Sequence, residues 1–185
     1  MHILALSGSL RQASINSAFC RAAARLAPEN MQVSVFTGLG ALPLFNPDLE
    51  ADPPSAVRDF RLAVGRADAL LIASPEYAHG ISGVMKNALD WLVSDEGVVY
   101  KPVALVNTSP RAHHAYEALR EILKTMSTTL VVDASIALPL LSSCFTEEGM
   151  LASPEARGAI KASMAALAAH LSGTAESPNA NFSIT

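Results

Sequence analysis

Hydroxyl, amide and guanidinium side chains are concentrated in one short segment near the N-terminus, from Gly8 to Ser17. The segment follows an apolar run and leads into helical spacing of apolar residues, which predicts a junction between a strand and a helix. Backbone N–H groups at the start of a helix, together with the helix dipole, favour a bound anion. Five side chains add donors to this predicted anion site: Ser9, Arg11, Ser14, Asn16 and Ser17. An ordinary loop in which Ser14 caps the helix is the alternative.

Two motifs that this junction lacks narrow the class of anion. It has no G-x-x-x-x-G-K-[ST] sequence, so no lysine is placed for a nucleoside triphosphate with magnesium. It has no G-x-G-x-x-G sequence either, because Gly8 stands alone in the loop, and a dinucleotide pyrophosphate needs that close approach to the backbone. Hydroxyls and one arginine therefore favour a terminal monophosphate.

Two further polar segments, 74–83 and 108–114, each follow an apolar run. Glu76 and His79 are spaced poorly for a shared metal ion, so we expect no metal site. No G-x-S-x-G sequence supports a serine hydrolase, and neither Cys20 nor Cys144 belongs to a recognisable nucleophile motif. A site of backbone amides, hydroxyls and one aromatic ring is typical of an enzyme whose cofactor performs the chemistry.

The elements that must position these loops alternate between strand and helix. Strands are expected at 3–6, 32–36, 69–73, 103–107 and 130–136, the last broken near Asp133, and helices at 15–26, 55–66, 84–93, 115–126 and 154–171. This alternation predicts an α/β fold with a doubly wound, five-stranded parallel sheet and helices on both faces. In the strand order 2-1-3-4-5 the first, third and fourth strands are neighbours, so the three polar loops converge. We expect a single domain over residues 1–171 and a polar C-terminal tail over 172–185.

Composition limits the partners of the protein. Half of the 185 residues are hydrophobic and 16% are charged, so the chain can build a substantial core. A formal net charge of −4 with no basic cluster argues against a nucleic-acid partner. No apolar run approaches the ~20 residues of a membrane span. Two cysteines far apart favour reduced thiols in a cytoplasmic protein.

Four segments carry a family resemblance. They are Gly8-Ser-Leu-Arg-Gln-Ala-Ser-Ile-Asn16, Leu42-Pro-Leu-Phe-Asn-Pro-Asp-Leu49, Ser74-Pro-Glu-Tyr77 and Gly83-Val-Met-Lys-Asn-Ala-Leu-Asp-Trp-Leu92. In this order and combination they resemble the NADPH-dependent FMN reductase family, which has a flavodoxin-like fold and includes quinone, azo-dye and chromate reductases. The resemblance implies an FMN-dependent NAD(P)H oxidoreductase. Hydride would pass from NADPH or NADH to the flavin and on to free flavin, a quinone or a related acceptor.

The resemblance also implies roles for particular residues. Ser9, Arg11, Ser14, Asn16 and Ser17 would bind the FMN phosphate, and Pro75, Glu76 and Tyr77 the flavin ring, largely through backbone groups. Ser109 would lie at the far edge of the ring. Arg111 is a candidate cationic partner for flavin O2 or for the NADPH phosphate. No side chain is expected to act as a catalytic acid or base, because the hydride goes to flavin N5. The family usually packs the helix after the second loop against another subunit, which implies a homodimer or homotetramer.

Two alternatives remain open from the residues. A flavodoxin-like electron carrier would take its electrons from a partner reductase, and carriers of this kind tend to be strongly acidic. A binding module that kept the fold and lost the flavin site is suggested by the third loop. That loop reads Ser109-Pro-Arg-Ala-His-His114, where the family is often rich in glycine.

Overall fold

A parallel sheet forms the centre of the molecule in the computed structural model, which describes residues 1–109, 113–138 and 144–175. Its strands lie in the order β2 (Gln32–Phe36), β1 (His2–Ser7), β3 (Ala69–Ala73), β6 (Pro102–Asn107) and β7 (Thr129–Leu130), and β8 (Ile136–Ala137) also pairs with β6. Counted without the separate hairpin β4–β5, this is the predicted order 2-1-3-4-5. The predicted fifth strand consists of two short strands, because a 3₁₀ turn, η4 (Val132–Ala134), interrupts it at Asp133.

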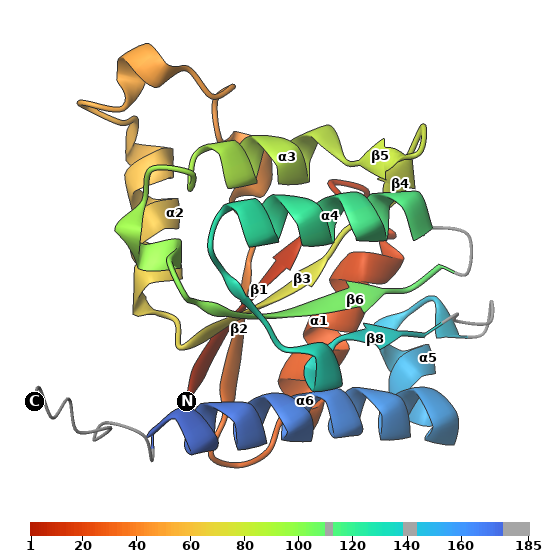
Figure 1. Ribbon diagram of the computed structural model, residues 1–185. Helices are drawn as coiled ribbons and strands as arrows, with labels where there is room; N and C mark the ends of the chain where they lie inside the picture. Colours follow the sequence, from red (N-terminus) through yellow and green to blue (C-terminus); the bar gives the residue numbers. More distant parts are fainter. Residues whose placement is uncertain (110–112, 139–143, 176–185) are drawn as a thin grey trace, which may run out of the picture.

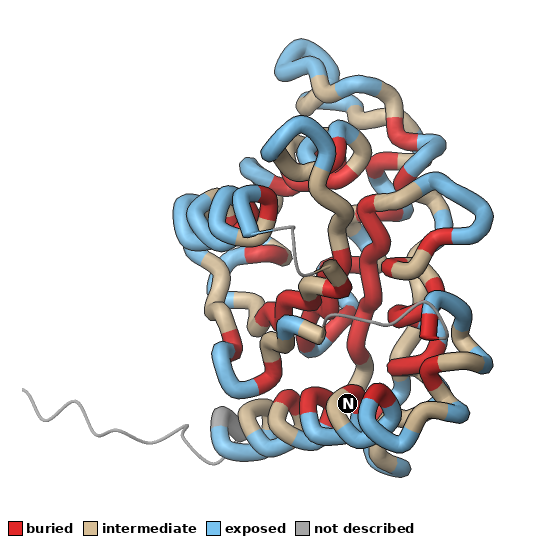
Figure 2. The backbone as a smooth tube through the Cα atoms, turned by 90° about the vertical axis from the view of Figure 1, so that its right-hand side faces the viewer, coloured by how far each residue is buried: buried red, intermediate tan, exposed pale blue. Residues whose placement is uncertain are grey.

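The central strands are apolar because both of their faces are covered. All five residues of β3 are buried, and Ile3 to Leu6 of β1 are at most 3% exposed. Parallel strands covered on both faces read as continuous apolar runs, as these do. In Figure 2 the buried backbone runs through the middle of the molecule, and the exposed backbone lies around it.

Three helices cover each face of the sheet. On one face α1 (Ile15–Leu26), α5 (Glu147–Ala152) and α6 (Pro154–Ala175) pack with β1 and β3 around Phe19, Ile160 and Met164. On the other face α2 (Ser55–Arg66), α3 (Gly83–Asp90) and α4 (His113–Thr125) bury Phe60, Met85 and Trp91. Figure 1 shows α3 and α4 on the opposite side of the sheet from α6. This is the three-layer arrangement that a doubly wound sheet requires.

Several element boundaries differ from the expectation. Helix α3 ends at Asp90 rather than Val93, because the chain turns after Trp91, whose carbonyl accepts a hydrogen bond from the side chain of Arg61 at 2.9 Å. Helix α6 continues to Ala175 through the start of the predicted tail, and 176–185 lie outside the described residues. Periodicity did not indicate the shortest elements, which are β4 (Glu76–Tyr77), β5 (Gly80–Ile81), η1 (Leu39–Ala41), η2 (Pro47–Leu49), η3 (Glu96–Val98) and α5.

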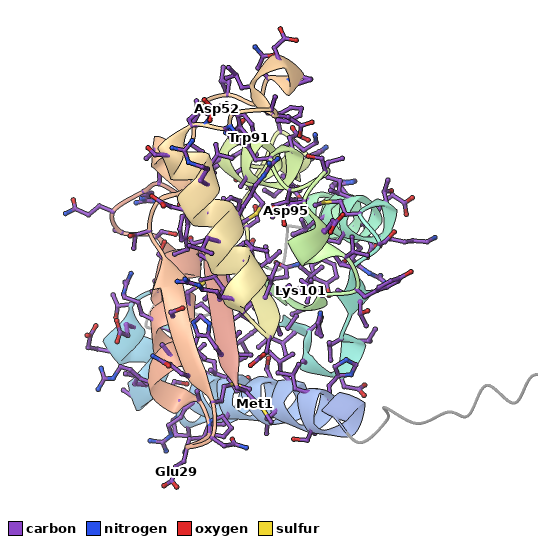
Figure 3. The ribbon with its side chains drawn as sticks, turned by 90° about the vertical axis from the view of Figure 1, so that its left-hand side faces the viewer. Met1, Glu29, Asp52, Trp91, Asp95 and Lys101 are labelled. Atoms are coloured by element: carbon purple, nitrogen blue, oxygen red, sulfur yellow. The ribbon has the colours of Figure 1, made fainter. Side chains whose placement is uncertain are left out.

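The long segment between β2 and α2 is fastened to α3 and the turn that follows it. The carbonyl of Pro43 accepts hydrogen bonds from Trp91 Nε1 at 2.8 Å and from Asn87 Nδ2 at 3.0 Å. The Oδ1 of Asn87 accepts from the N–H of Phe45 at 2.8 Å, and the Phe45 ring meets Trp91 edge-on at 5.0 Å. At the tip, 84% of Leu44 is exposed. In Figure 3 Trp91 lies toward the N-terminal end of α2, and Lys101 lies near the opposite end of that helix.

Candidate cofactor site

A pocket of about 440 Å³ lies at the carboxyl edge of the sheet, beyond the ends of β1 and β3. This volume falls within the range of small-molecule sites, roughly 300–1,000 Å³. Three segments contribute its lining: the first loop with the start of α1, the second loop, and the segment before α5. The lining residues are Ser9, Arg11, Ala13, Ser14, Ile15, Asn16, Pro75, Tyr77, Phe145 and Thr146.

The start of α1 presents unused donors to this pocket. Ser14 caps the helix, and its Oγ accepts a hydrogen bond from the N–H of Ser17 at 3.2 Å. The Oγ of Ser17 lies 2.8 Å from the Oγ of Ser7, so this hydroxyl holds the start of the first loop against α1. Within the described residues, no hydrogen bond uses the backbone N–H groups of Ile15 and Asn16, which both line the pocket. A helix N-terminus with open N–H groups is a binding site for an anion.

Arg11 adds a cation to these neutral donors. Its backbone N–H donates to Ser9 Oγ at 3.3 Å, which folds the loop back on itself. No ion pair between described residues includes its guanidinium, and Arg11 lines the pocket. A guanidinium binds phosphate oxygens through two parallel hydrogen bonds. The first loop thus offers what a monophosphate needs: open N–H groups, hydroxyls and a forked cation.

The first loop is in close contact with the other two loops, as the strand order predicted. The N–H of Gly8 donates to the carbonyl of Ala73 at 2.9 Å, and a Cβ on Gly8 would lie 2.6 Å from Ser74 Oγ. The third loop contacts the first through Thr108, whose Oγ1 donates to Asn16 Oδ1 at 3.1 Å, and both side chains are buried. The predicted convergence of the three loops is confirmed.

The second loop is a hairpin that projects from the sheet edge and rests on α4. The Oε2 of Glu76 accepts a hydrogen bond from the N–H of Ala115 in the first turn of α4 at 2.8 Å. The rings of His79 and His114 stack with their centroids 4.3 Å apart. Ala78 and His79 at the hairpin tip have φ angles of 49° and 59°, the left-handed region that favours glycine and asparagine. Tyr77 is 59% exposed, so one aromatic ring lines the pocket without being packed into the core.

Six of the ten predicted site residues line the pocket: Ser9, Arg11, Ser14, Asn16, Pro75 and Tyr77. The side chain of Ser17 is directed to Ser7, and its N–H donates to Ser14 Oγ. The side chain of Glu76 is directed to α4. Ser109 is not part of the lining, and its N–H donates to Asn107 Oδ1 at 3.0 Å. Arg111 lies outside the described residues.

Sequence reasoning missed Phe145 and Thr146. Thr146 caps α5 by accepting from the N–H of Gly149 at 3.1 Å, and Glu147 and Glu148 follow it directly. A threonine followed by two acidic residues is a signal for the start of a helix, so α5 itself could have been found. Nothing local indicates that this helix lies against the pocket, because that placement depends on packing against α1.

Three further observations describe the chemical setting. Across 1–109, 113–138 and 144–175, no cluster of three or more His, Cys, Asp or Glu side chains is arranged to hold a metal ion. None of the helices in that part of the chain has the length and apolar character needed to cross a membrane. Complete burial raises the pKa of the Cys20 thiol from 9.0 to about 12, so this thiol, on the buried face of α1, is inert.

The fold and the pocket together define a class. A parallel sheet in this strand order, with a donor-rich pocket at its carboxyl edge, is the flavodoxin-like arrangement. The chain superposes with a TM-score of 0.72 on FerB, a flavoenzyme NAD(P)H:(acceptor) oxidoreductase from Paracoccus denitrificans, over 91% of this chain and 98% of that one. Only 24% of the residues are identical, so this likeness shows the fold.

Sequence comparison gives the family within that class. Residues 1–143 match the family described as NADPH-dependent FMN reductase, and the chain belongs to this family. It is 33% identical to an NAD(P)H-dependent FMN reductase of Pseudomonas aeruginosa over 171 residues, 89% of this chain and 92% of the relative. It is 34% identical to a quinone reductase of Pseudomonas putida over 151 residues, 78% of this chain and 81% of the relative. The expected enzyme class, an FMN-containing oxidoreductase that uses NAD(P)H, is confirmed.

Proposed function

We propose that this protein takes hydride from NADPH or NADH onto bound FMN and passes the electrons to a quinone, a free flavin or a related small acceptor. The observation that carries the proposal is the donor-rich pocket at the start of α1, which has the chemistry and the size for a flavin mononucleotide. Relatives named as FMN reductase and quinone reductase support the choice of acceptor class.

The residues of the pocket fit the two ends of FMN differently. The open N–H groups of Ile15 and Asn16, the hydroxyls of Ser9 and Ser14 and the guanidinium of Arg11 would hold the phosphate. Ser17 would contribute by supporting the loop, since its hydroxyl pairs with Ser7 and its N–H donates to Ser14 Oγ. This donor set is acceptor-poor and cationic, which suits an anion.

The second loop would position the ring. Pro75 and Tyr77 line the pocket and would offer backbone groups and a flat apolar surface, with the backbone of Glu76 between them. Bound FMN supplies the hydride-accepting chemistry at its N5 atom. Ser109 at the far edge of the ring and Arg111 near flavin O2 or the NADPH phosphate stay part of the proposal.

We also propose that the protein is a homodimer or homotetramer in the cytoplasm. The exposed Leu44 lies on a segment fastened to Asn87 and Trp91, so an apolar side chain stands on a fixed support. An interface would cover this side chain, because apolar contacts are typical of the core of an interface. Burial of both cysteines as reduced thiols fits a reducing compartment. Light scattering and cell fractionation test the two statements.

Titration of the purified protein with FMN, followed by NADPH and NADH, tests the function. We expect a flavin-binding protein that oxidises NADPH or NADH when a quinone or free flavin is present. Arg11→Ala should weaken FMN binding by ~2–3 kcal/mol, the contribution of a charge-assisted hydrogen bond. Arg66→Ala is the matched control, since it removes the same charge from the exposed C-terminal end of α2.

Two outcomes would contradict the proposal. A protein that neither binds FMN nor consumes NADPH or NADH would be the flavin-site-deficient binding module. A protein that binds FMN but accepts electrons solely from a partner reductase would be the electron carrier. Equal FMN affinity in wild type and Arg11→Ala would show that the phosphate does not bind at the first loop.

A further inference from the structure

One wall of the pocket comes from the C-terminal half of the chain, outside the segments that carry the family resemblance. Phe145 and Thr146 line the pocket together with Arg11 and Ser14. Phe145 is 46% exposed, so its ring is a surface of the pocket and is not packed into the core. An apolar ring beside a phosphate-binding loop has no role in holding the phosphate directly, because it offers no donor.

The segment that carries Phe145 is fixed to α1. Two residues after Phe145, the Oε2 of Glu147 accepts from Arg21 Nε at 2.9 Å, and its Oε1 accepts from Arg25 Nη1 at 3.4 Å. The Glu147 side chain is only 16% exposed, which distinguishes these pairs from ordinary surface pairs. In the same short helix Met150 is completely buried. Arg21 and Arg25 lie about two and three turns after the start of α1, the same helix whose N-terminus opens into the pocket.

The charges of this cluster are compatible with an anion nearby. Glu147 alone would repel a phosphate, but it is paired with two arginines, so the trio has a net positive charge. The carboxylate can therefore hold the segment in place without repelling an anion in the pocket. Phe145, α5 and the open N–H groups of α1 thus belong to one connected unit.

We propose that Phe145 covers the phosphate end of bound FMN and that Glu147 is the positioning residue that holds Phe145 there. This inference rests on the proposed function. The first loop approaches the phosphate from one side, and water has access from the other. An apolar ring on that other side excludes water, and hydrogen bonds to an ion are stronger where water is excluded. The segment therefore controls how tightly the phosphate is retained.

Titration with two flavins tests the role of Phe145. FMN carries the phosphate and riboflavin lacks it, and binding of either is measured by flavin fluorescence. We expect Phe145→Ala to raise the dissociation constant of FMN about tenfold, the scale of one lost aromatic contact. The same variant should leave riboflavin binding unchanged, and Phe145→Leu should restore most of the FMN affinity. Equal FMN affinity in wild type and Phe145→Ala, or an equal loss for both flavins, would overturn the proposal.

A pair of neighbouring glutamates tests the positioning role. Glu147→Gln should weaken FMN binding a few-fold, whereas Glu148→Gln removes the same charge from the same first turn of α5 and should not. No ion pair between described residues includes Glu148. In a Phe145→Ala background, Glu147→Gln should still lower the melting temperature but should no longer change FMN affinity. If Glu147→Gln weakens FMN binding equally with and without Phe145→Ala, Glu147 does not act through Phe145, and its positioning role is overturned.

The wild-type titration separates this inference from the function on which it rests. If wild-type protein does not bind FMN, the proposed function fails. If wild-type protein binds FMN and the Phe145 and Glu147 variants bind it equally well, the proposed function stands and this inference fails.

Discussion

The two sides of the pocket are built in different ways. On the α1 side three polar side chains are buried and hydrogen-bonded close by: Ser7, Ser14 and Asn16 are at most 8% exposed, and they pair with Ser17 and Thr108. On the hairpin side Tyr77, Ala78 and His79 are exposed. That side is held by contacts with α4, through Glu76 and the stack of His79 on His114.

Backbone conformation follows the same division. Left-handed backbone occurs at two non-glycine residues of the hairpin, Ala78 and His79, and at none between Ser7 and Ser17. The other described cases, Tyr100 and Ser127, do not line the pocket. Such conformations cost about 1–2 kcal/mol per residue and persist where the surroundings hold them. The α1 side is therefore preorganised for one ligand group, whereas the hairpin side stores strain and depends on a neighbouring helix. If the site acts as proposed, the α1 side would hold the constant phosphate firmly, and the ring side would be free to adjust to different acceptors.

Adding a methyl group at Gly8 should have the largest effect on stability and binding, because Gly8 lies where the two sides of the pocket meet. In Gly8→Ala the new Cβ would lie 2.6 Å from Ser74 Oγ, 2.8 Å from Ser82 Oγ and 3.1 Å from Met85 Cβ. Ser82 is buried and caps α3, so it cannot move without loss of that cap. We expect a loss of about 1–3 kcal/mol in the free energy of unfolding and weaker FMN binding.

Chemical denaturation and flavin titration measure both effects of Gly8→Ala. Gly83→Ala is the control, because a Cβ at Gly83 meets nothing within 4 Å. If both variants unfold at the same denaturant concentration, the close approach of the two loops is not required.

The stability of the protein at alkaline pH tests whether the core under the α1 side excludes water. Cys20 is neutral in the native state up to about pH 12, whereas its unfolded-state pKa is near 9.0. The thiolate therefore stabilises the unfolded state as pH rises from 9.0 toward 12, and stability is unaffected well below 9.0. We expect wild type to lose about 1.4 kcal/mol more than Cys20→Ala between roughly pH 8 and pH 10. Urea unfolding at both pH values measures the difference, and parallel pH profiles would contradict it.

Removal of the Glu76 carboxylate should loosen the hairpin side alone. Glu76→Ala leaves the N–H of Ala115 without its acceptor at the start of α4 and should cost about 1 kcal/mol. Amide hydrogen exchange should accelerate at Ala115 and stay unchanged in α1. Glu117→Ala, an exposed carboxylate later in α4, is the control. Faster exchange in α1 as well would show that the two sides are not independent.

Relief of strain at the hairpin tip should give the smallest change, and in the stabilising direction. Asparagine adopts the left-handed region more readily than alanine, so Ala78→Asn should raise the free energy of unfolding by about 0.5 kcal/mol. The same substitution at Ala165, exposed in the middle of α6, should lower it, because asparagine is a poor helix former. Thermal unfolding compares the two, and a destabilised Ala78→Asn would argue that the tip carries no strain.

The sequence was sufficient for the long elements and for the α1 side of the site. Helices 15–26 and 55–66 and the strand 69–73 were predicted with the bounds that the structure has, because apolar periodicity and caps define them locally. The donor-rich first loop could be read for the same reason, since its donors and its helix start are contiguous in the chain.

The rest depended on contacts between distant segments. The hairpin 76–81 is two pairs of residues long, too short for periodicity, and Ala78 and His79 are not the residues that mark such a turn. The side chain of Glu76 accepts a hydrogen bond from Ala115 of α4, 39 positions later. Phe145 reaches the pocket because Glu147 is paired with α1, more than 120 positions earlier. No local pattern encodes these pairings.

The long segment around Leu44 has a consequence for the kinetics of association. Its backbone is already ordered by Trp91, Asn87 and Phe45 within a single chain. In the proposed dimer or tetramer, a second copy that binds there would meet a rigid surface, so little conformational entropy would be lost on encounter. The association rate should then be set by diffusion and orientation, with no slow folding step before complex formation.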